Sequence, residues 1–315
     1  MNGLELSHGY YETYGKAMLE NDFADVLPYL AVGFVGSGSE HYGFDDEVSR
    51  DHDYEPGFCI FLPGEDVVDR ARAFQLERAY AKLPKEYCGV KRLPISPVGG
   101  NRNGVIRTAD FYTAAVGSPD GSLSVQEWIH IPDYALAEAV NGEVFFDHYG
   151  EFSKIREGLM EMPNDIKLKR IAGNLLIMAQ SGQYNFVRCL QHGEPEAAQL
   201  ACVEFVNSAM KVLFLLNGRY MPYYKWSFRA LQQIDSVSGL VRKLSFLLFA
   251  DHHDPALAEQ KCSVIEEIAS RIITELQARN LTNAICGDLE KHAYSLNDMI
   301  RDSTVRNLHI LASIT

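Results

Sequence analysis

Two short polar segments near the start of the chain contain residues that could do phosphate chemistry. The first is a Gly-Ser-Gly-Ser turn at residues 36–39, and the second places Asp51 and Asp53 on either side of His52. Alternate residues of a strand share a face, so the two carboxylates are expected about 5–6 Å apart, where they repel by roughly 3 kcal/mol. A divalent cation turns that repulsion into attraction, and Mg²⁺ favours a carboxylate pair completed by substrate phosphates.

The turn before the acids has the composition of a phosphate-binding loop. Gly36 and Gly38 let backbone N–H groups approach a phosphate closely, and Ser37 and Ser39 add hydroxyl donors. Taken separately, a Gly-Ser turn is commonly a flexible surface turn, and an Asp-x-Asp pair is commonly a solvated strand end. Their order along the chain, each beside a hydrophobic segment, favours a site for phosphoryl or nucleotidyl transfer.

Two hydrophobic segments are expected to position these residues. Residues 30–35 and 58–62 read as short buried strands, one before the turn and one after the acids. The Pro- and Gly-rich residues 89–104 predict a long loop, which either covers the site or is an idle surface insertion.

Helices are expected in the same half of the chain. The first is predicted over residues 10–20, with Ser7 as its cap. The second is predicted within residues 64–85, with Asp66 as its cap, because apolar residues there approximate helical spacing.

From about residue 154 the hydrophobic pattern becomes helical. Apolar residues recur at steps of three and four, and glycines and prolines separate the segments, which predicts an antiparallel bundle. These segments cover residues 167–190, 196–217, 224–233, 240–249 and 256–279. We therefore expect an α+β fold, with a small mixed-sheet α/β domain over residues 1–153 and an α-helical bundle over residues 154–315.

Length, charge and cysteine content narrow the class of protein. The 315 residues suffice for two domains. We read no apolar run as long enough to span a bilayer and no signal peptide at the start, so we expect a cytoplasmic protein without a membrane partner. The net charge of −13 disfavours nucleic acid as a partner. The six cysteines form no Cys-x-x-Cys pair, which indicates free, mostly buried thiols.

The turn and the acid pair together resemble the signature of the nucleotidyltransferase superfamily typified by DNA polymerase β and kanamycin nucleotidyltransferase. That signature is Gly-Ser or Gly-Gly, a spacer, and Asp-x-Asp or Asp-x-Glu; here 13 residues separate Ser37 from Asp51. The segments at residues 141–145, 183–185 and 222–226 look like a bacterial branch that carries a helical domain behind the transferase domain.

The resemblance implies a reaction and its cofactors. A nucleoside monophosphate would pass from a nucleoside triphosphate, ATP first among the candidates, to an unidentified hydroxyl acceptor. Asp51 and Asp53 would be the catalytic residues and the Mg²⁺ ligands, and Ser37 and Ser39 would hold the phosphates together with the amides of the turn. The acidic net charge favours a small neutral or cationic acceptor.

The superfamily also implies a third carboxylate on a later strand, and the chain departs from that pattern. The equivalent residues 104–108 contain no acid, so Asp110, Glu127 and Asp147 are the nearby candidates, and Asp110 is taken as the third catalytic residue. The departure leaves a catalytically impaired nucleotide-binding regulator as an alternative. A transferase that modifies protein or tRNA is another, and a homodimer stays open.

The helical half offers two cations for the phosphates. Arg188 could bind phosphate in a bidentate way, or pair with Glu194 instead. Lys225 could reach the triphosphate with an aromatic neighbour on the base, or the aromatic residues of segment 223–226 could be bundle core. Residues 251–254, Asp-His-His-Asp, suggest a metal site, but a helix cap followed by proline is the favoured interpretation.

Overall fold

The computed structural model describes residues 1–49, 54–92 and 103–314, and the chain divides into two compact units. The first unit comprises residues 1–123 and 135–161, and the second comprises residues 124–134 and the chain from residue 162 onward. The main boundary therefore lies eight residues later than the expected 153/154. The reason is that α7 (Glu151–Met160) packs in the first unit, so a boundary at residue 153 would cut this helix.

The first unit is built on a small mixed sheet, which confirms the expected α+β class. Its strand order is β5-β2-β1-β6, with β1 antiparallel to both β2 and β6 and with β2 parallel to β5. The two expected strands are present as β1 and β2. The strands are β1 (Ala31–Phe34), β2 (Cys59–Leu62), β5 (Gly104–Arg107) and β6 (Glu143–Asp147), and a separate hairpin joins β3 (Glu86–Tyr87) to β4 (Val90–Lys91).

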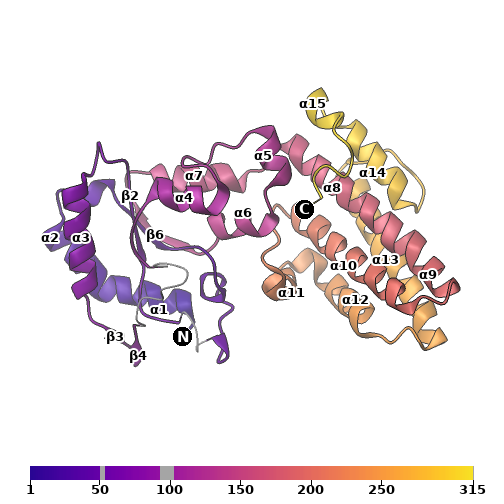
Figure 1. Cartoon of the computed structure of the whole chain (residues 1–315), viewed down its shortest axis with the longest axis horizontal. Helices are drawn as coiled ribbons and strands as arrows, with labels where there is room; N and C mark the ends of the chain where they lie inside the picture. The colour runs from indigo at the N-terminus through magenta and orange to yellow at the C-terminus, as the bar shows by residue number, and fades with distance from the viewer. Residues whose placement is uncertain (50–53, 93–102, 315) are drawn as a thin grey trace. The chain divides into compact units, whose positions relative to one another are not determined.

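Helices cover both faces of this sheet (Figure 1). Ile60 and Leu62 belong to a buried cluster with residues of α1, α2 and α3. Phe61 points to the other face, because side chains alternate along a strand; its ring centroid lies 5.2 Å from that of Phe111 on α4 and 4.0 Å from that of Phe152 on α7. The other helices of this unit are α1 (Gly3–Tyr10), α2 (Lys16–Asp22), α3 (Arg70–Lys82), α4 (Thr108–Val116) and most of α6 (Asp133–Val140).

Two helix starts differ from the expectation. α1 begins after Asn2, whose side chain accepts from the backbone N–H of Glu5, so the predicted cap Ser7 is buried inside this helix. A π-helical turn, Tyr11–Gly15, continues α1 into α2. α3 begins after Asp69, which caps it in place of Asp66. In both cases the side chain that reaches the third helical N–H is the one that fixes the start of the helix.

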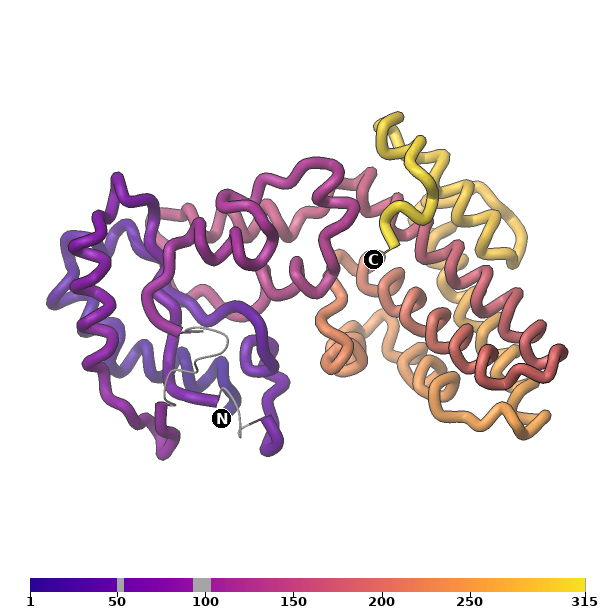
Figure 2. The backbone as a smooth tube through the Cα atoms, viewed as in Figure 1, coloured from indigo at the N-terminus to yellow at the C-terminus, as the bar shows by residue number. Residues whose placement is uncertain are grey.

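The second unit is an α-helical bundle whose long helices run side by side (Figure 2), as expected. α8 (Asn164–Met178) continues without a break through a π-helix (Ala179–Phe186) into α9 (Val187–Gln191). The predicted helical segments are all present. Four of them are α10 (Pro195–Leu216), α11 (Tyr224–Gln232), α12 (Ser238–Phe249) and α13 (Pro255–Ala278). Two shorter helices follow, α14 (Leu289–Asp298) and α15 (Ser303–Arg306).

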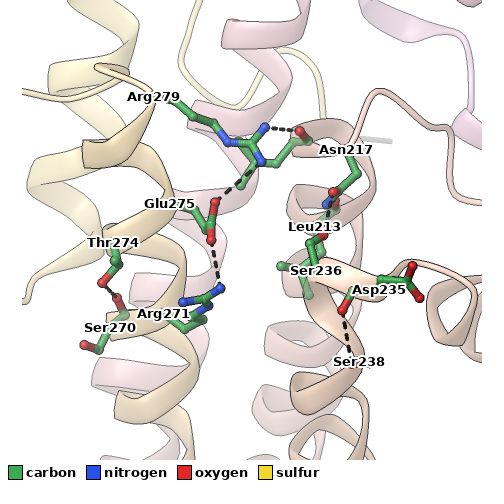
Figure 3. A network of polar contacts seen from close by, with 11 residues as sticks. Leu213, Asn217, Asp235, Ser236, Ser238, Ser270, Arg271, Thr274, Glu275 and Arg279 are labelled. Carbon is green, nitrogen blue, oxygen red and sulfur yellow. Dashed lines mark hydrogen bonds and ion pairs between the residues drawn. The ribbon is translucent and has the colours of Figure 1, made fainter.

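The side chain of Arg279, the residue after α13, satisfies the end of α10 (Figure 3). The guanidinium of Arg279 donates to the carbonyl of Leu216, the last residue of α10. Glu275 lies 3.5 Å from Arg279 and 2.9 Å from Arg271. The last carbonyls of a helix lack partners within the helix, so Arg279 fixes where α10 ends against α13.

Segment 124–134 belongs to the second unit, and a buried ion pair links it to α8. It contains α5 (Val125–His130), and Arg170 of α8 donates to the carbonyl of Ile131 and, at 2.5 Å, to the carboxylate of Asp133. Both side chains are at least nine-tenths buried. Burial raises the pKa of the Asp133 carboxyl, and the charge of Arg170 opposes that rise.

Two expectations about composition need correction. Within the described residues one helix, α10, is long and apolar enough by composition to cross a membrane, but 61% of its most apolar window is buried, as in the core helix of a soluble protein. All six cysteines are free, as expected, yet only Cys59 and Cys202 are buried.

Candidate functional site

The end of β1 and the start of β2 lie at the same edge of the sheet, which we call the turn edge. The two strands are antiparallel, with Gly33 opposite Cys59 and Ala31 opposite Phe61. The glycine–serine turn, residues 36–39, therefore leaves the sheet at the edge where the chain enters β2. Asp51 and Asp53 lie outside the described residues, six or more positions before that strand.

The glycine–serine turn exposes one of its two serines. Gly36 and Gly38 have φ of 131° and 125°, a backbone region that residues with a Cβ rarely adopt. Ser37 lies between them and is exposed, whereas Ser39 is buried and its hydroxyl donates to the carboxylate of Glu40 at 3.4 Å. The structure therefore leaves the hydroxyl of Ser37 accessible for a ligand and turns that of Ser39 inward.

A buried glutamate and a buried histidine lie next to the turn. The carboxylate of Glu40 packs against Gly38, where an added Cβ would lie 2.2 Å from Oε1. Oε1 is also 3.4 Å from Nδ1 of His41, and the His41 ring stacks on Phe34 with centroids 4.1 Å apart. Neither Glu40 nor His41 was expected to have a role, although an acid and a histidine directly after a Gly-Ser turn are a signal in the sequence.

Asn141 holds the first residue of the turn. Its Oδ1 accepts from the N–H of Gly36 at 2.9 Å, and its Nδ2 donates to the carbonyl of Gly36 at 2.6 Å. The N–H of Gly36 is thus already used within the protein. A phosphate bound by the turn would have to use the amides that follow Gly36, which corrects the expectation for this residue.

The segment that leads from the acid pair into β2 is fixed by contacts from elsewhere in the first unit. The hydroxyl of Tyr54 donates to the carbonyl of Met1 at 3.1 Å. Nε of Arg92 donates to the carbonyl of Pro56 at 3.3 Å, and the ring of Tyr80 lies 4.8 Å from the same guanidinium.

The two ends of the loop expected over residues 89–104 belong to other elements. Gly89 belongs to the turn of the β3–β4 hairpin, and Gly104 begins β5. Asn103, just before β5, donates to Glu55 at 3.3 Å. Residues 93–102 lie outside the described part of the chain, but Arg92 and Asn103, which flank them, both contact the segment that follows the acid pair.

The three candidates for a further carboxylate are not among the residues that form the turn edge. Asp110 is exposed in the first turn of α4, which starts where Arg107 pairs with Leu62, at the opposite edge. α4 returns over the sheet, however, and the ring of Phe111 comes 4.0 Å from the position of a Cβ at Gly36. Asp110 is thus the candidate whose helix contacts the turn.

The other two candidates serve as helix caps. Asp147 is opposite Ala31, away from the turn, and accepts from the N–H groups of Gly150 and Ser153 at 2.7 and 2.8 Å. Glu127 belongs to the second unit and forms a capping box with Ser124. The backbone N–H of Ser124 holds the pKa of the Glu127 carboxyl below its usual value.

The structure does not bring Arg188 and Lys225 together. Both belong to the second unit, where Arg188 lies in α9 and Lys225 is exposed in the first turn of α11. The 22-residue helix α10, about 33 Å long, runs between these segments. The Arg188 guanidinium lies over the ring of Tyr184, 5.0 Å from its centroid, so one triphosphate would not contact both cations.

Segments 223–226 and 251–254 differ in what the structure shows for their candidate side chains. Tyr223 and Tyr224 are exposed, which excludes them from the bundle core. Asp254 caps α13, and His252 is buried, with its ring nitrogens 2.8 Å from the Pro195 carbonyl and 3.1 Å from Nζ of Lys261. Among the described residues, no group of three or more His, Cys, Asp or Glu side chains could hold a metal ion.

The second unit also contains a groove that sequence reasoning missed. A cavity of about 580 Å³ lies beside the π-helix, and its lining includes Gln180, Gln183, Tyr184 and Glu266. Gln183 donates to Glu266 at 2.8 Å and accepts from the N–H of Leu289 at 2.9 Å, so it ties the π-helix to α13 and α14. The π-helical register has no signature in hydrophobic spacing, which is why only a continuous helix was expected there.

Comparisons with known proteins give one match. A family model described as a domain of unknown function (DUF4037) matches residues 128–227, less than half of the chain. That match includes Asn141, Arg188 and Lys225 and leaves out the glycine–serine turn and the acid pair. No curated protein and no solved structure shows significant similarity to the chain.

Proposed function

We propose that the chain is a Mg²⁺-dependent nucleotidyltransferase that moves a nucleoside monophosphate from a nucleoside triphosphate, ATP first among them, to a hydroxyl of a small acceptor. The observation that carries the proposal is the antiparallel register of β1 and β2. It puts the glycine–serine turn at the edge where the chain that follows Asp51 and Asp53 enters the sheet. The exposed hydroxyl of Ser37 at that edge supports the same interpretation.

The residues of the turn and the acid pair have separate roles in this proposal. The Ser37 hydroxyl and the amides after Gly36 bind the β- and γ-phosphates. The carboxylates of Asp51 and Asp53 hold Mg²⁺, which when bound neutralises phosphate charge. The acceptor oxygen forms a bond to the α-phosphorus, the bond from that phosphorus to the bridging oxygen breaks, pyrophosphate leaves, and the acceptor proton passes to a base.

The charge of the chain bears on the acceptor. With 42 acidic residues against 29 Lys and Arg, the chain attracts neutral or cationic molecules more readily than polyanions. A small molecule is therefore the proposed acceptor, with transfer to protein or tRNA as the alternative outcome. The cytosol is the proposed compartment.

One observation favours a second candidate function, a nucleotide-binding regulator without transferase activity. β5 is the strand on which the superfamily pattern implies a third carboxylate, and its four residues contain none. Arg107 ends the strand and donates to the carbonyls of Pro63 and Val68 at 2.6 and 2.8 Å, which is a structural role. A regulator of this kind would bind Mg-NTP and release no pyrophosphate.

The first prediction concerns the acid pair. Mg-ATP at 100 times its dissociation constant should stabilise the wild-type protein by about 2.7 kcal/mol. Asp51→Asn combined with Asp53→Asn should remove the Mg²⁺-dependent part of that stabilisation, measured by thermal unfolding with each of the four NTPs. Glu77→Gln combined with Glu86→Gln makes the same charge change at exposed positions of α3 and β3 and should respond as the wild type does.

A second assay separates the transferase from its alternatives. The purified protein is incubated with each NTP labelled at the α-phosphate, together with cell lysate. Label in a small molecule supports the proposal, label in a macromolecule supports transfer to protein or tRNA, and nucleotide binding without transfer supports the regulator. If the double Asp variant is stabilised by Mg-NTP as the wild type is, the site assignment is wrong.

A further inference from the structure

The loop between α6 and β6 is hydrogen-bonded to the glycine–serine turn, 105 positions away in the sequence. Asn141 is in this loop, and its carboxamide bonds both the N–H and the carbonyl of Gly36. Two hydrogen bonds from one planar group fix the peptide units on both sides of Gly36. They therefore set the direction in which the chain leaves β1 toward Ser37.

Arg156 of α7 holds this loop in turn. Its Nη2 donates to the carbonyls of Val140, Asn141 and Gly142 at 2.9, 3.0 and 3.1 Å. A guanidinium remains charged at all physiological pH values, so these bonds are charge-assisted. Arg156 thereby fixes the backbone from which the Asn141 side chain extends.

The backbones of the loop and of β1 also touch directly. A Cβ at Gly142 would lie 2.0 Å from the carbonyl oxygen of Phe34, and one at Gly33 would lie 2.6 Å from that of Glu143. Only glycine permits this approach at both positions. The register of β1 and β6 is also irregular between Val32 and Gly33, next to this contact.

We propose that Asn141 and Arg156 are positioning residues that hold the glycine–serine turn in the conformation that binds the triphosphate. This inference rests on the proposed function, because it assigns the turn to phosphate. Gly36 and Gly38 give the turn wide backbone freedom, and a turn that samples several conformations binds its ligand in proportion to the competent fraction. Asn141, held by Arg156, removes that freedom before the nucleotide arrives.

The test measures binding and turn protection separately. Kd for Mg-ATP and for Mg-tripolyphosphate is determined by calorimetry at a temperature where every variant is folded. Asn141→Ala and Arg156→Met should each raise both Kd values about tenfold, the result of reducing the competent fraction to a tenth. Asn141→Asp keeps the acceptor for the Gly36 N–H and loses the donor, so it should weaken binding as well.

Arg107→Met is the matched control for Arg156→Met. Arg107 also donates to two backbone carbonyls of the first unit, but at the opposite edge of the sheet. Its loss should lower stability and leave Kd unchanged. A purely structural role for Arg156 would give the same result as this control and would overturn the proposal.

Hydrogen exchange distinguishes failure of the inference from failure of the proposed function. In Asn141→Ala the amides of residues 36–39 should exchange faster, while those of β2 keep wild-type protection. Wild-type Kd values together with unchanged exchange would refute the positioning role. If the wild-type protein binds no nucleotide, the proposed function and its affinity consequence both fail, and exchange alone then decides whether Asn141 holds the turn.

Discussion

The two serines of the turn lie two positions apart and carry the same hydroxyl group, yet their surroundings differ. Ser37 projects at the exposed point of the turn, and Ser39 starts the short 3₁₀ segment Ser39–Tyr42, with its side chain against Glu40. Gly36 and Gly38, on either side of Ser37, have positive φ, so the chain does not continue the regular strand path of β1 through the two serines. A hydroxyl that already donates to a buried carboxylate contributes to stability and is unavailable to a ligand.

The pair therefore gives a prediction at the scale of single residues. Ser37→Ala should raise Kd for Mg-ATP several-fold and leave unfolding unchanged, because an exposed hydroxyl contributes little to folding. Ser39→Ala should lower stability by about 1 kcal/mol and leave Kd unchanged, because it removes a buried hydrogen bond. Calorimetry and thermal unfolding on both variants check this; equal effects on Kd would mean that both serines face the ligand.

At the scale of elements, one buried lysine connects three parts of the bundle. Lys261 of α13 donates to Gln199 of α10 at 3.2 Å and to Nδ1 of His252 at 3.1 Å. Since Nδ1 accepts from the ammonium, the imidazole proton lies on Nε2, which points to the carbonyl of Pro195. Burial lowers the pKa of Lys261 below its ordinary value of 10.5, and the nearby Cys202 and Asp251 oppose that shift.

This lowered pKa has a consequence for the pH dependence of stability. Between the folded pKa and 10.5 the unfolded chain binds more protons than the folded chain, so the contribution of Lys261 to the free energy of unfolding rises with pH. Relative to Lys261→Met, the wild-type protein should therefore gain stability as the pH rises from the folded pKa toward 10.5. Urea unfolding of both proteins across this range measures it; a difference that falls with pH would contradict the lowered pKa.

At the scale of the whole molecule, the chain passes between its two units more than once. It enters the second unit at residue 124, returns to the first at residue 135 and leaves it again after residue 161. Residues 124–134 lie within the sequence of the first unit but pack in the second, so a stable contact with the second unit is needed. The buried pair of Asp133 and Arg170, with the bond from Arg170 to Ile131, provides that contact.

Asp133→Asn should consequently destabilise the second unit by about 3–5 kcal/mol, because it leaves the charge of Arg170 buried without its partner. Hydrogen exchange should report the loss as faster exchange in α5, with the β1 and β2 amides unaffected. Glu65→Gln removes the partner of Arg70 in an exposed pair and should leave exchange unchanged. Wild-type protection of α5 in the Asp133 variant would show that packing alone retains the segment.

Local patterns were sufficient for much of the architecture. Apolar runs bounded by Gly and Pro predicted β1 and β2, and spacings of three and four predicted every long helix of the second unit. Glycines at 36 and 38 predicted a turn that only glycine can form. These features depend on residues that are close together in the sequence, and backbone sterics or side-chain periodicity fix them without reference to the rest of the chain.

The tertiary structure decided which residues the turn contacts and what its neighbours do. Asn141 reaches Gly36 only because β6 pairs with β1. The two residues are 105 positions apart, and no local pattern in the sequence predicts that pairing. Strand register likewise placed Asp147 at the far edge, and the contacts of segment 124–134 with α8 put Glu127 in the second unit. A contact between distant segments depends on how whole elements pack, so its free energy belongs to the assembled unit and is not encoded in either segment alone.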